Sequence, residues 1–333
     1  APDNDSSGQN TGRAYLVALG GGGGALTLAR YVVYGDDEHD HVGTDVLLGT
    51  DLDDDGDPEV IATAEGDDAG GSEAGAVYVF DGALTGRVSA PTADHVVEGD
   101  TRDRLSVLPP SPTDVDGDGV HDLVVGGWGA DGDASQSGAV FVFLGPMVGD
   151  PGVASADVVL LGEDYKDAAG RDLDIYDTDG DGNLDLLVGA PGNDAAGTDA
   201  GAAYLVMGPL SSSLSLAAAD AVFRGEAADD ALGQAVAMVD KEGSGSAGLF
   251  LGAPGNDATA TEAGAVFRFS GVPTGTLSTT DADARYLGEV EDDETGSYLL
   301  RGGDVDGDGL DDLLVGSPGY QSGGLVMGAF YVL

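Results

Sequence analysis

One acidic loop recurs along this chain at a nearly constant interval. The loops begin at Asp51, Asp114, Asp177, Asp240 and Asp304, which lie 63, 63, 63 and 64 residues apart. A period of this length indicates that one supersecondary unit is repeated, and that each copy buries its apolar surface against its neighbours. This repeat constrains the fold more than any single segment does.

Four of the five loops have the oxygen-rich pattern of a calcium site. When each loop is numbered from its first Asp, positions 1, 3 and 5 are carboxylates, position 6 is Gly and position 9 is Asp or Glu. Calcium takes six to eight oxygen ligands, and alternate residues of a tight turn can direct theirs at one point, with the position 7 carbonyl adding another. The predicted ligand residues are Asp51, Asp53, Asp55, Asp57 and Glu59; Asp114, Asp116, Asp118, Val120 and Asp122; Asp177, Asp179, Asp181, Asn183 and Asp185; and Asp304, Asp306, Asp308, Leu310 and Asp312.

The fourth loop, DKEGSGSAG at 240–248, departs from this pattern. It keeps Asp240 and Glu242, but Ser244 and Gly248 replace the acids of positions 5 and 9. We therefore expect about four bound calcium ions and no ion in this loop.

The residues after each loop predict β-strands. A helix-loop-helix calcium site needs Glu at position 12, where this chain has Ala62, Val125, Val188 and Val315. Short apolar runs such as EVIATA and DLLVGA follow the loops instead, and three further strand-like runs complete each period. Four strands per repeat predict an all-β fold, a β-propeller of four-stranded blades with five full repeats and a partial N-terminal one.

The motifs after the loops resemble the FG-GAP repeat, the unit of the integrin alpha-subunit propeller. The resemblance rests on Gly189-Ala190-Pro191, Gly252-Ala253-Pro254, Gly316-Ser317-Pro318 and Leu232-Gly233, the last standing where the family has Phe-Gly. Phe-Gly itself never appears, and 62–64 and 126–128 replace the Gly-Ala-Pro motif. The resemblance implies calcium in hairpin loops on one face and ligand recognition by loops on the other.

The repeat register predicts one domain over 1–333. Its parts are the second half of a repeat at 1–35, four repeats at 36–99, 100–162, 163–225 and 226–288, and a last repeat at 289–333 without its outer strand. Residues 1–17 align without gaps to 190–206, so the chain begins inside a repeat. Two interpretations stay open: a segment of a longer polypeptide, or a five-blade ring with a spare strand that allows self-assembly through the chain ends.

Composition favours a secreted, non-catalytic module. Cysteine is absent, so metal is the available cross-link, and weak calcium modules fill where calcium is abundant outside cells. The net charge of −49 argues against nucleic acid or an anionic membrane as a direct partner. This charge is compatible with an unknown protein or glycan ligand, including one bridged by divalent ions. A salt-adapted origin would also explain it. No apolar run is long enough to insert into a membrane.

Two groups of residues outside the acidic loops attract attention. Trp128 and Tyr320 lie in loops expected on the ligand face, as ligand anchors or as caps on neighbouring blades. His39 and His41 are surrounded by acidic residues in the sequence. They are either transition-metal ligands or solvent-facing loop residues.

Catalytic signatures are missing from the sequence. It has no GxSxG, no HExxH and no phosphate-binding Gly-Lys-Ser/Thr motif, and only a glycosidase-like pair among its many acids stays open. We expect a non-catalytic adhesion or ligand-binding module. The alternatives are a structural subunit of a surface assembly or filament, and an accessory domain of a larger secreted enzyme.

Overall fold

The computed structural model describes residues 10–16, 31–35, 37–81, 86–109, 113–322 and 325–333. Their contacts define two compact units, the first within 1–114, 118–130 and 141–158, and the second within 115–117, 131–140 and 159–333. Regular structure in the described residues is strand, apart from short 3-10 turns at Ala90–Thr92, Val153–Ser155, Leu216–Ala218 and Thr279–Asp281. The predicted all-β class is confirmed.

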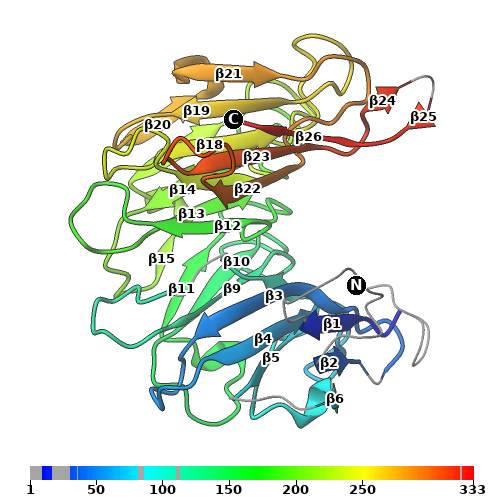
Figure 1. Ribbon diagram of the computed structural model, residues 1–333, viewed down its shortest axis with the longest axis vertical. Helices are drawn as coiled ribbons and strands as arrows, with labels where there is room; N and C mark the ends of the chain where they lie inside the picture. Colours follow the sequence, from blue (N-terminus) through cyan, green and yellow to red (C-terminus); the bar gives the residue numbers. More distant parts are fainter. Residues whose placement is uncertain (1–9, 17–30, 36, 82–85, 110–112, 323–324) are drawn as a thin grey trace. The chain divides into compact units, whose positions relative to one another are not determined.

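The first unit contains a four-stranded antiparallel sheet in the order β3-β4-β5-β7 (Figure 1). Its strands are β3 (Val42–Thr50), β4 (Glu59–Ala64), β5 (Ala76–Phe80) and β7 (His95–Glu98). The middle strands β4 and β5 are almost wholly buried, as their continuous apolar runs predict. A second sheet, β1-β2-β6, consists of β1 (Arg13–Leu16), β2 (Tyr31–Tyr34) and β6 (Gly86–Ser89).

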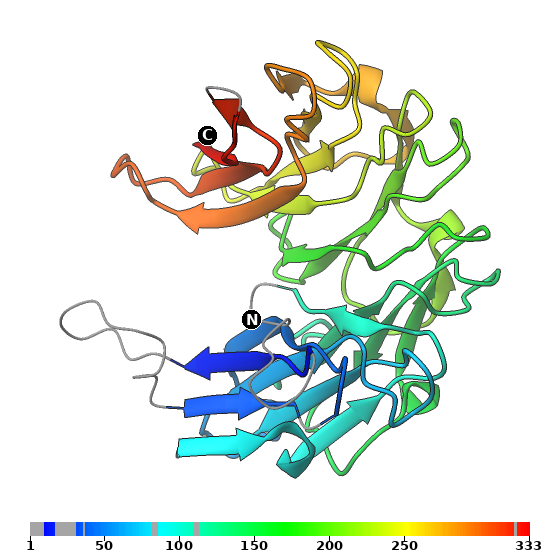
Figure 2. The same ribbon diagram turned by 90° about the vertical axis from the view of Figure 1, so that its right-hand side faces the viewer.

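The second unit contains three sheets built from successive repeats (Figure 2). The first has the order β12-β13-β14-β16-β20, the second β17-β18-β19-β21 and the third β22-β23-β26. The opening strands β12, β17 and β22 contact one another in turn. Their bounds are β12 (Leu173–Tyr176), β13 (Asp185–Ala190), β14 (Ala202–Val206), β16 (Ala221–Arg224), β20 (Gly275–Ser278), β17 (Val236–Val239), β18 (Gly248–Ala253), β19 (Ala265–Phe269), β21 (Ala284–Leu287), β22 (Tyr298–Gly303), β23 (Asp312–Ser317) and β26 (Ala329–Val332).

The core of the second unit lies between consecutive sheets. Leu205 and Phe223 of one repeat pack with Leu249, Phe267 and Phe269 of the next. The rings of Phe223 and Phe269 are tilted, with centroids 4.7 Å apart. Each buried Phe or Leu contributes about 1.5–3 kcal/mol, so each sheet depends on its neighbour for stability.

A further sheet has the order β15-β11-β10-β9-β8. It contains β8 (Leu105–Val107), β9 (Leu123–Gly127), β10 (Ala139–Phe143), β11 (Val158–Leu161) and β15 (Leu214–Ser215). A short hairpin of β24 (Gln321–Ser322) and β25 (Leu325–Val326) completes the described strands.

Glycines at the repeat period allow the backbone to approach itself closely. A Cβ on Gly162 would lie 2.0 Å from the carbonyl oxygen of Ser137, and one on Gly225 would lie 2.0 Å from that of Ala200. The two sites are 63 residues apart and make the same hydrogen bond, each N–H donating over 2.9 Å to the oxygen of Gly138 or Gly201. Close backbone approach therefore requires Gly at this position of the repeat, in addition to the apolar residues that packing requires.

The strands agree with the predicted runs in each repeat. Strand β1 lies 189 residues before the start of β14, as the alignment of the chain's first residues predicts, although residues 1–9 and 17 lie outside the described residues. Sheets of about four strands per repeat are present, and the propeller built from them stays a prediction. Among the described residues, no helix has the length and apolar character needed to cross a bilayer.

Candidate metal centres in the acidic loops

The first Asp of each acidic loop organises the turn that follows it. Asp177 accepts the N–H of Asp181 at 3.1 Å through Oδ1 and that of Gly182 at 3.0 Å through Oδ2. Asp51 makes the equivalent pair of bonds with Asp55 and Gly56, both at 3.1 Å. The position 6 glycines have φ near +90°, a conformation that side chains disfavour. These hydrogen bonds and the glycine conformation define the tight turn.

These turns bring carboxylate oxygens together in four loops. In each group the ligand atoms lie within 4.8 Å of one another. Two oxygens on one calcium ion, each at most roughly 2.6 Å from it, can be at most roughly 5.2 Å apart, so each group fits a single ion. The groups are Asp51, Asp53, Asp55 and Glu59; Asp114, Asp116 and Asp122; Asp177, Asp179 and Asp185; and Asp304, Asp306 and Asp308.

The acid at position 9 is buried in all four loops and connects the loop to its strand. Asp185 accepts the N–H of Thr178 at 2.8 Å and that of Gly208 at 2.9 Å. Asp122 accepts the N–H of Gly145 at 2.9 Å in the same way. In the loops of Glu59, Asp122 and Asp185 this residue therefore positions the loop and also belongs to the carboxylate group.

Glu59 is the acid of the first loop whose surroundings best fit a bound cation. Only 2% of the residue is exposed, its Oε2 accepts the N–H of Leu52 at 2.5 Å, and its Oε1 has no hydrogen-bond partner. The pKa of Glu59 is raised to about 7, mainly by burial; the Leu52 bond opposes this rise and the charges of Asp53 and Asp51 add to it. A buried carboxylate oxygen without a partner is unfavourable, and a divalent ion in the group would satisfy it.

Some predicted ligands lie outside the groups. Asp181 directs its carboxylate at Asn183, accepting that residue's N–H at 2.8 Å and its Nδ2–H at 2.9 Å. These bonds lower the pKa of Asp181. The participation of the remaining predicted ligands stays a prediction: Asp57, Asp118, Val120, Asp181, Asn183, Leu310 and Asp312 are not members of the four groups.

The fourth loop forms the same turn with fewer acids. Asp240 accepts the N–H of Ser244 at 3.0 Å and that of Gly245 at 2.7 Å. Glu242 points to Arg268, whose guanidinium lies 2.5 Å away. Within the described part of the chain, no group of three acids forms in 240–248; the absence of an ion there stays a prediction.

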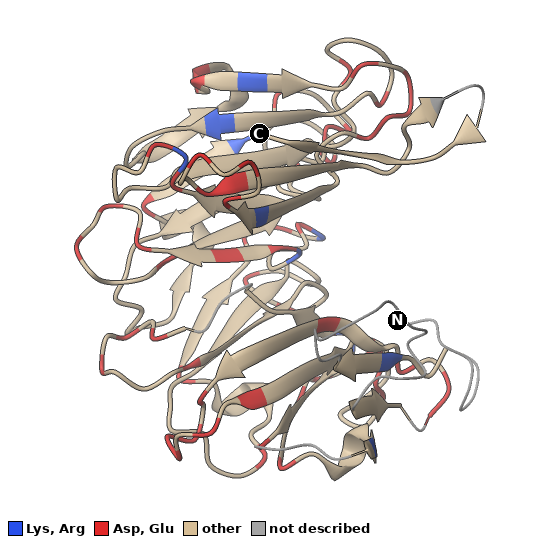
Figure 3. Ribbon diagram, viewed as in Figure 1, with Lys and Arg blue, Asp and Glu red and all other residues tan. Residues whose placement is uncertain are grey.

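A second series of aspartates, not recognised in the sequence, repeats at the same period. Asp40, Asp103, Asp167, Asp230 and Asp293 are 63 or 64 residues apart and all buried. Their carboxylates accept backbone N–H groups three residues earlier, at 2.7–3.1 Å. Acidic residues gather mainly in loops (Figure 3), so these five are hidden among exposed neighbours.

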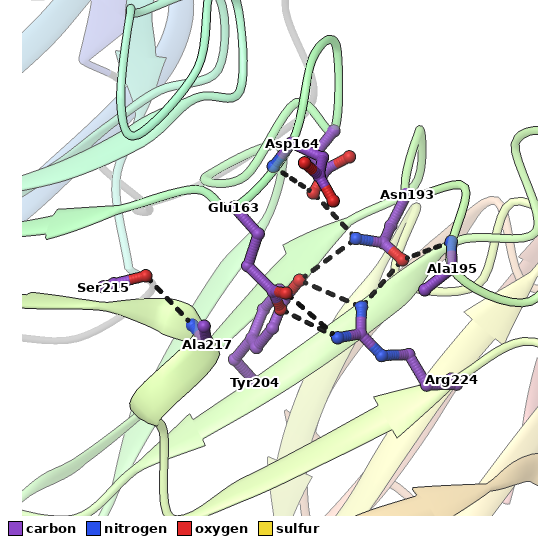
Figure 4. A network of polar contacts seen from close by, with 9 residues as sticks. Glu163, Asp164, Asn193, Ala195, Tyr204, Ser215, Ala217 and Arg224 are labelled. Atoms are coloured by element: carbon purple, nitrogen blue, oxygen red, sulfur yellow. Dashed lines mark hydrogen bonds and ion pairs between the residues drawn. The ribbon is translucent and has the colours of Figure 1, made fainter.

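One of these aspartates, Asp167, belongs to a polar network around Asn193 and Arg224 (Figure 4). Asn193 donates through Nδ2 to Asp167 at 2.7 Å and accepts from Arg224 at 2.7 Å. Arg224 also donates to both oxygens of Glu163, at 2.9 and 3.2 Å, and to Tyr204 Oη at 3.4 Å. The network connects strands β14 and β16 with the loop before β12 and the loop after β13.

Carboxylates also join the opening strands of consecutive repeats. Asp174 accepts the N–H of Met238, 64 residues later, at 2.6 Å. Asp45 accepts the N–H of Leu108, 63 residues later, at 3.0 Å. Burial raises the pKa of Asp174 to about 6, opposed by Arg301 and by the backbone bonds.

The aromatic residues proposed for the ligand face are both half-buried. Trp128 lies under the Arg104 guanidinium, 4.6 Å from ring centroid to Cζ, an arrangement that suits a cap as well as an anchor. Two histidines make backbone contacts: His121 Nδ1 accepts the N–H of Asp51 at 3.1 Å, and His95 Nδ1 lies 2.9 Å from the oxygen of Gly149.

Comparison with known proteins identifies the repeat. The FG-GAP repeat family model matches residues 169–206 and 298–327, so the chain carries FG-GAP repeats, as the motifs predicted. A phosphatidylinositol-glycan-specific phospholipase D of Dictyostelium discoideum is 28% identical over 235 residues. The match covers 62% of this chain and 24% of that protein, so the chain spans about a quarter of the relative's length.

Proposed function

We propose that this chain is a calcium-binding, non-catalytic module of a secreted or cell-surface protein, built as a β-propeller, which binds a protein or glycan ligand. The observation that carries the proposal is the recurrence of one carboxylate group in four equivalent loops. The buried Oε1 of Glu59, which has no hydrogen-bond partner, supports it because a bound cation would satisfy that oxygen.

In three of the four loops the carboxylates that would hold calcium come from both ends of the loop. Positions 1 and 3 open the turn, and the position 9 acid belongs to or directly precedes the following strand. An ion bound there would neutralise the clustered charge and cross-link loop and strand. We therefore infer that calcium rigidifies the hairpins, in a chain that has no disulfides for that purpose.

The ligand would be recognised away from these loops. FG-GAP repeats place calcium at one end of the sheets, which leaves the loops at the other end for a partner. The net charge of −49 favours a cationic partner, or one bridged by divalent ions, over nucleic acid or an anionic bilayer. An extracellular location follows from the loop type, since weak calcium modules require abundant calcium.

A second candidate is an accessory module of a larger enzyme. It is favoured by the similarity to a phosphatidylinositol-glycan-specific phospholipase D, of which the match spans only 24%. In this case the chain would position a substrate or stabilise a catalytic domain, and it would not itself be catalytic.

Binding screens with a catalytic control distinguish these functions. The purified chain is applied to panels of immobilised glycans and extracellular matrix proteins, in calcium and in chelator, and is incubated with glycosylphosphatidylinositol. We expect ligand binding that requires calcium, and no turnover. Equal binding in chelator would contradict the role of calcium, and hydrolysis by the chain alone would contradict a non-catalytic module.

A further inference from the structure

A cavity of about 480 Å³ in the first unit contains two histidines that the acidic loops do not use. His39 and His41 line it from the loop before β3, and Glu65 and Asp68 line it from the loop after β4. The imidazole centroids are 6.5 Å apart, with the ring planes at 54°. The other histidines, His95 and His121, lie outside this cavity and contact backbone atoms.

Both histidines have a left-handed backbone conformation. His39 and His41 have φ of +75° and +58°, in the left-handed region that His, Asn and Asp adopt more readily than most residues. Between them Asp40 is buried and accepts the N–H of Asp37 at 3.0 Å. The His41 ring lies against Gly66, where an added Cβ would be 3.1 Å from its Cδ2. His39 and His41, two residues apart in one loop, thus line the same cavity.

The charges around the cavity favour a cation. Four carboxylates line it, from Glu38, Glu65, Asp68 and Glu73, against the single guanidinium of Arg104. Arg104 lies 2.6 Å from Glu73 and 3.6 Å from Glu65. The lining therefore has a net charge of −3 when the imidazoles are neutral. The two ion pairs of Arg104 involve Glu65 and Glu73, and the other two acids of the lining are Glu38 and Asp68.

We propose that His39 and His41 bind one late first-row divalent ion such as zinc, with the carboxylates of Glu38 and Asp68 as oxygen donors. Imidazole nitrogen prefers zinc, copper or nickel, whereas calcium prefers oxygen. With Zn–N distances of about 2.0–2.1 Å, two imidazoles on one tetrahedral zinc have centroids roughly 5 Å apart. The centroids of His39 and His41 are 6.5 Å apart, so binding requires these side chains to rotate toward one another. This site is separate from the four acidic loops and does not depend on them.

Zinc titration of the calcium-saturated chain tests this site. Isothermal titration calorimetry gives the stoichiometry and affinity, and histidine-ring NMR shows which imidazoles bind the ion. The variants are His39→Asn and His41→Asn, because Asn tolerates the left-handed backbone and so preserves the loop. His95→Asn is the matched control outside the cavity.

The expected result is one zinc ion per chain in excess calcium, with the ring signals of His39 and His41 shifted. Each of the two Asn variants should weaken binding at least about tenfold, since loss of even an indirect partner costs a metal site that much, and His95→Asn should leave it unchanged. Absence of zinc binding, or binding that neither cavity variant weakens, would overturn the proposal. Both results leave the calcium proposal untouched, because calcium is saturating throughout.

Discussion

Asp177 and Asp240 form a matched pair that separates metal binding from turn formation. Both open an acidic loop, and both accept the N–H groups of positions 5 and 6, at 3.1 and 3.0 Å for Asp177 and at 3.0 and 2.7 Å for Asp240. Only Asp177 belongs to a carboxylate group. Asp177→Asn and Asp240→Asn therefore weaken the same turn, but only Asp177→Asn removes a proposed calcium ligand.

The expected difference follows from ligand linkage. An ion present at one hundred times its Kd stabilises the folded chain by about 2.7 kcal/mol per site. Extracellular calcium modules have Kd values of about 10⁻⁴–10⁻³ M, so about 10 mM calcium reaches that excess for the tighter sites. Loss of one turn hydrogen bond costs about 0.5–1.5 kcal/mol in either variant. In calcium, Asp177→Asn should thus lose about 2–3 kcal/mol more than Asp240→Asn.

Urea unfolding followed by circular dichroism measures both variants in calcium and in chelator. The free energies of unfolding of the two variants should differ in calcium and converge in chelator, with unchanged m-values. If the two variants lose equal stability in calcium, the third loop does not bind the ion. If the deficit of Asp177→Asn persists in chelator, the residue acts through the turn alone.

Two further predictions concern buried charges. Arg224→Met should lower the free energy of unfolding by roughly 3–5 kcal/mol, because it leaves Glu163, with 17% of its side chain exposed, without its partner. The control Arg285→Met breaks a 3.7 Å ion pair whose Arg side chain is 40% exposed, and it should lower the free energy of unfolding by less than about 1 kcal/mol. Equal losses in the two variants would refute the network's role. The pKa of Asp174 is about 6 in the fold against an ordinary 3.8, so its ionisation removes stability as pH rises through that window. Asp174→Asn should therefore gain up to about 3 kcal/mol on the wild type between pH 4 and 7 in urea titrations, and a constant difference across that range would contradict the shift.

The loops and strands were predictable because their signals are local. A DxDxDG turn is specified by residues within one loop, and the apolar runs of β13 and β18 are continuous in the sequence. The same register predicted that Ser244 and Gly248 deprive the fourth loop of its acids. The FG-GAP resemblance, carried by short motifs after the loops, was confirmed for 169–206 and 298–327.

What the sequence did not reveal depends on contacts between residues far apart in the chain. Asp167 is one acid among 61, and only the packed loops show that it is buried against Asn193. The bond from Met238 to Asp174 joins residues 64 apart, which no local pattern specifies. At Asp181 the structure pairs the carboxylate with Asn183, a competition between neighbouring side chains that residue spacing does not resolve.

Native mass spectrometry of the calcium-loaded chain tests the central claim most directly, because it counts the ions. The four carboxylate groups predict four calcium ions per chain. Asp177→Asn should retain three, and Asp240→Asn should retain all four. A chain that retains no calcium, or the same number of ions in both variants, would contradict the account.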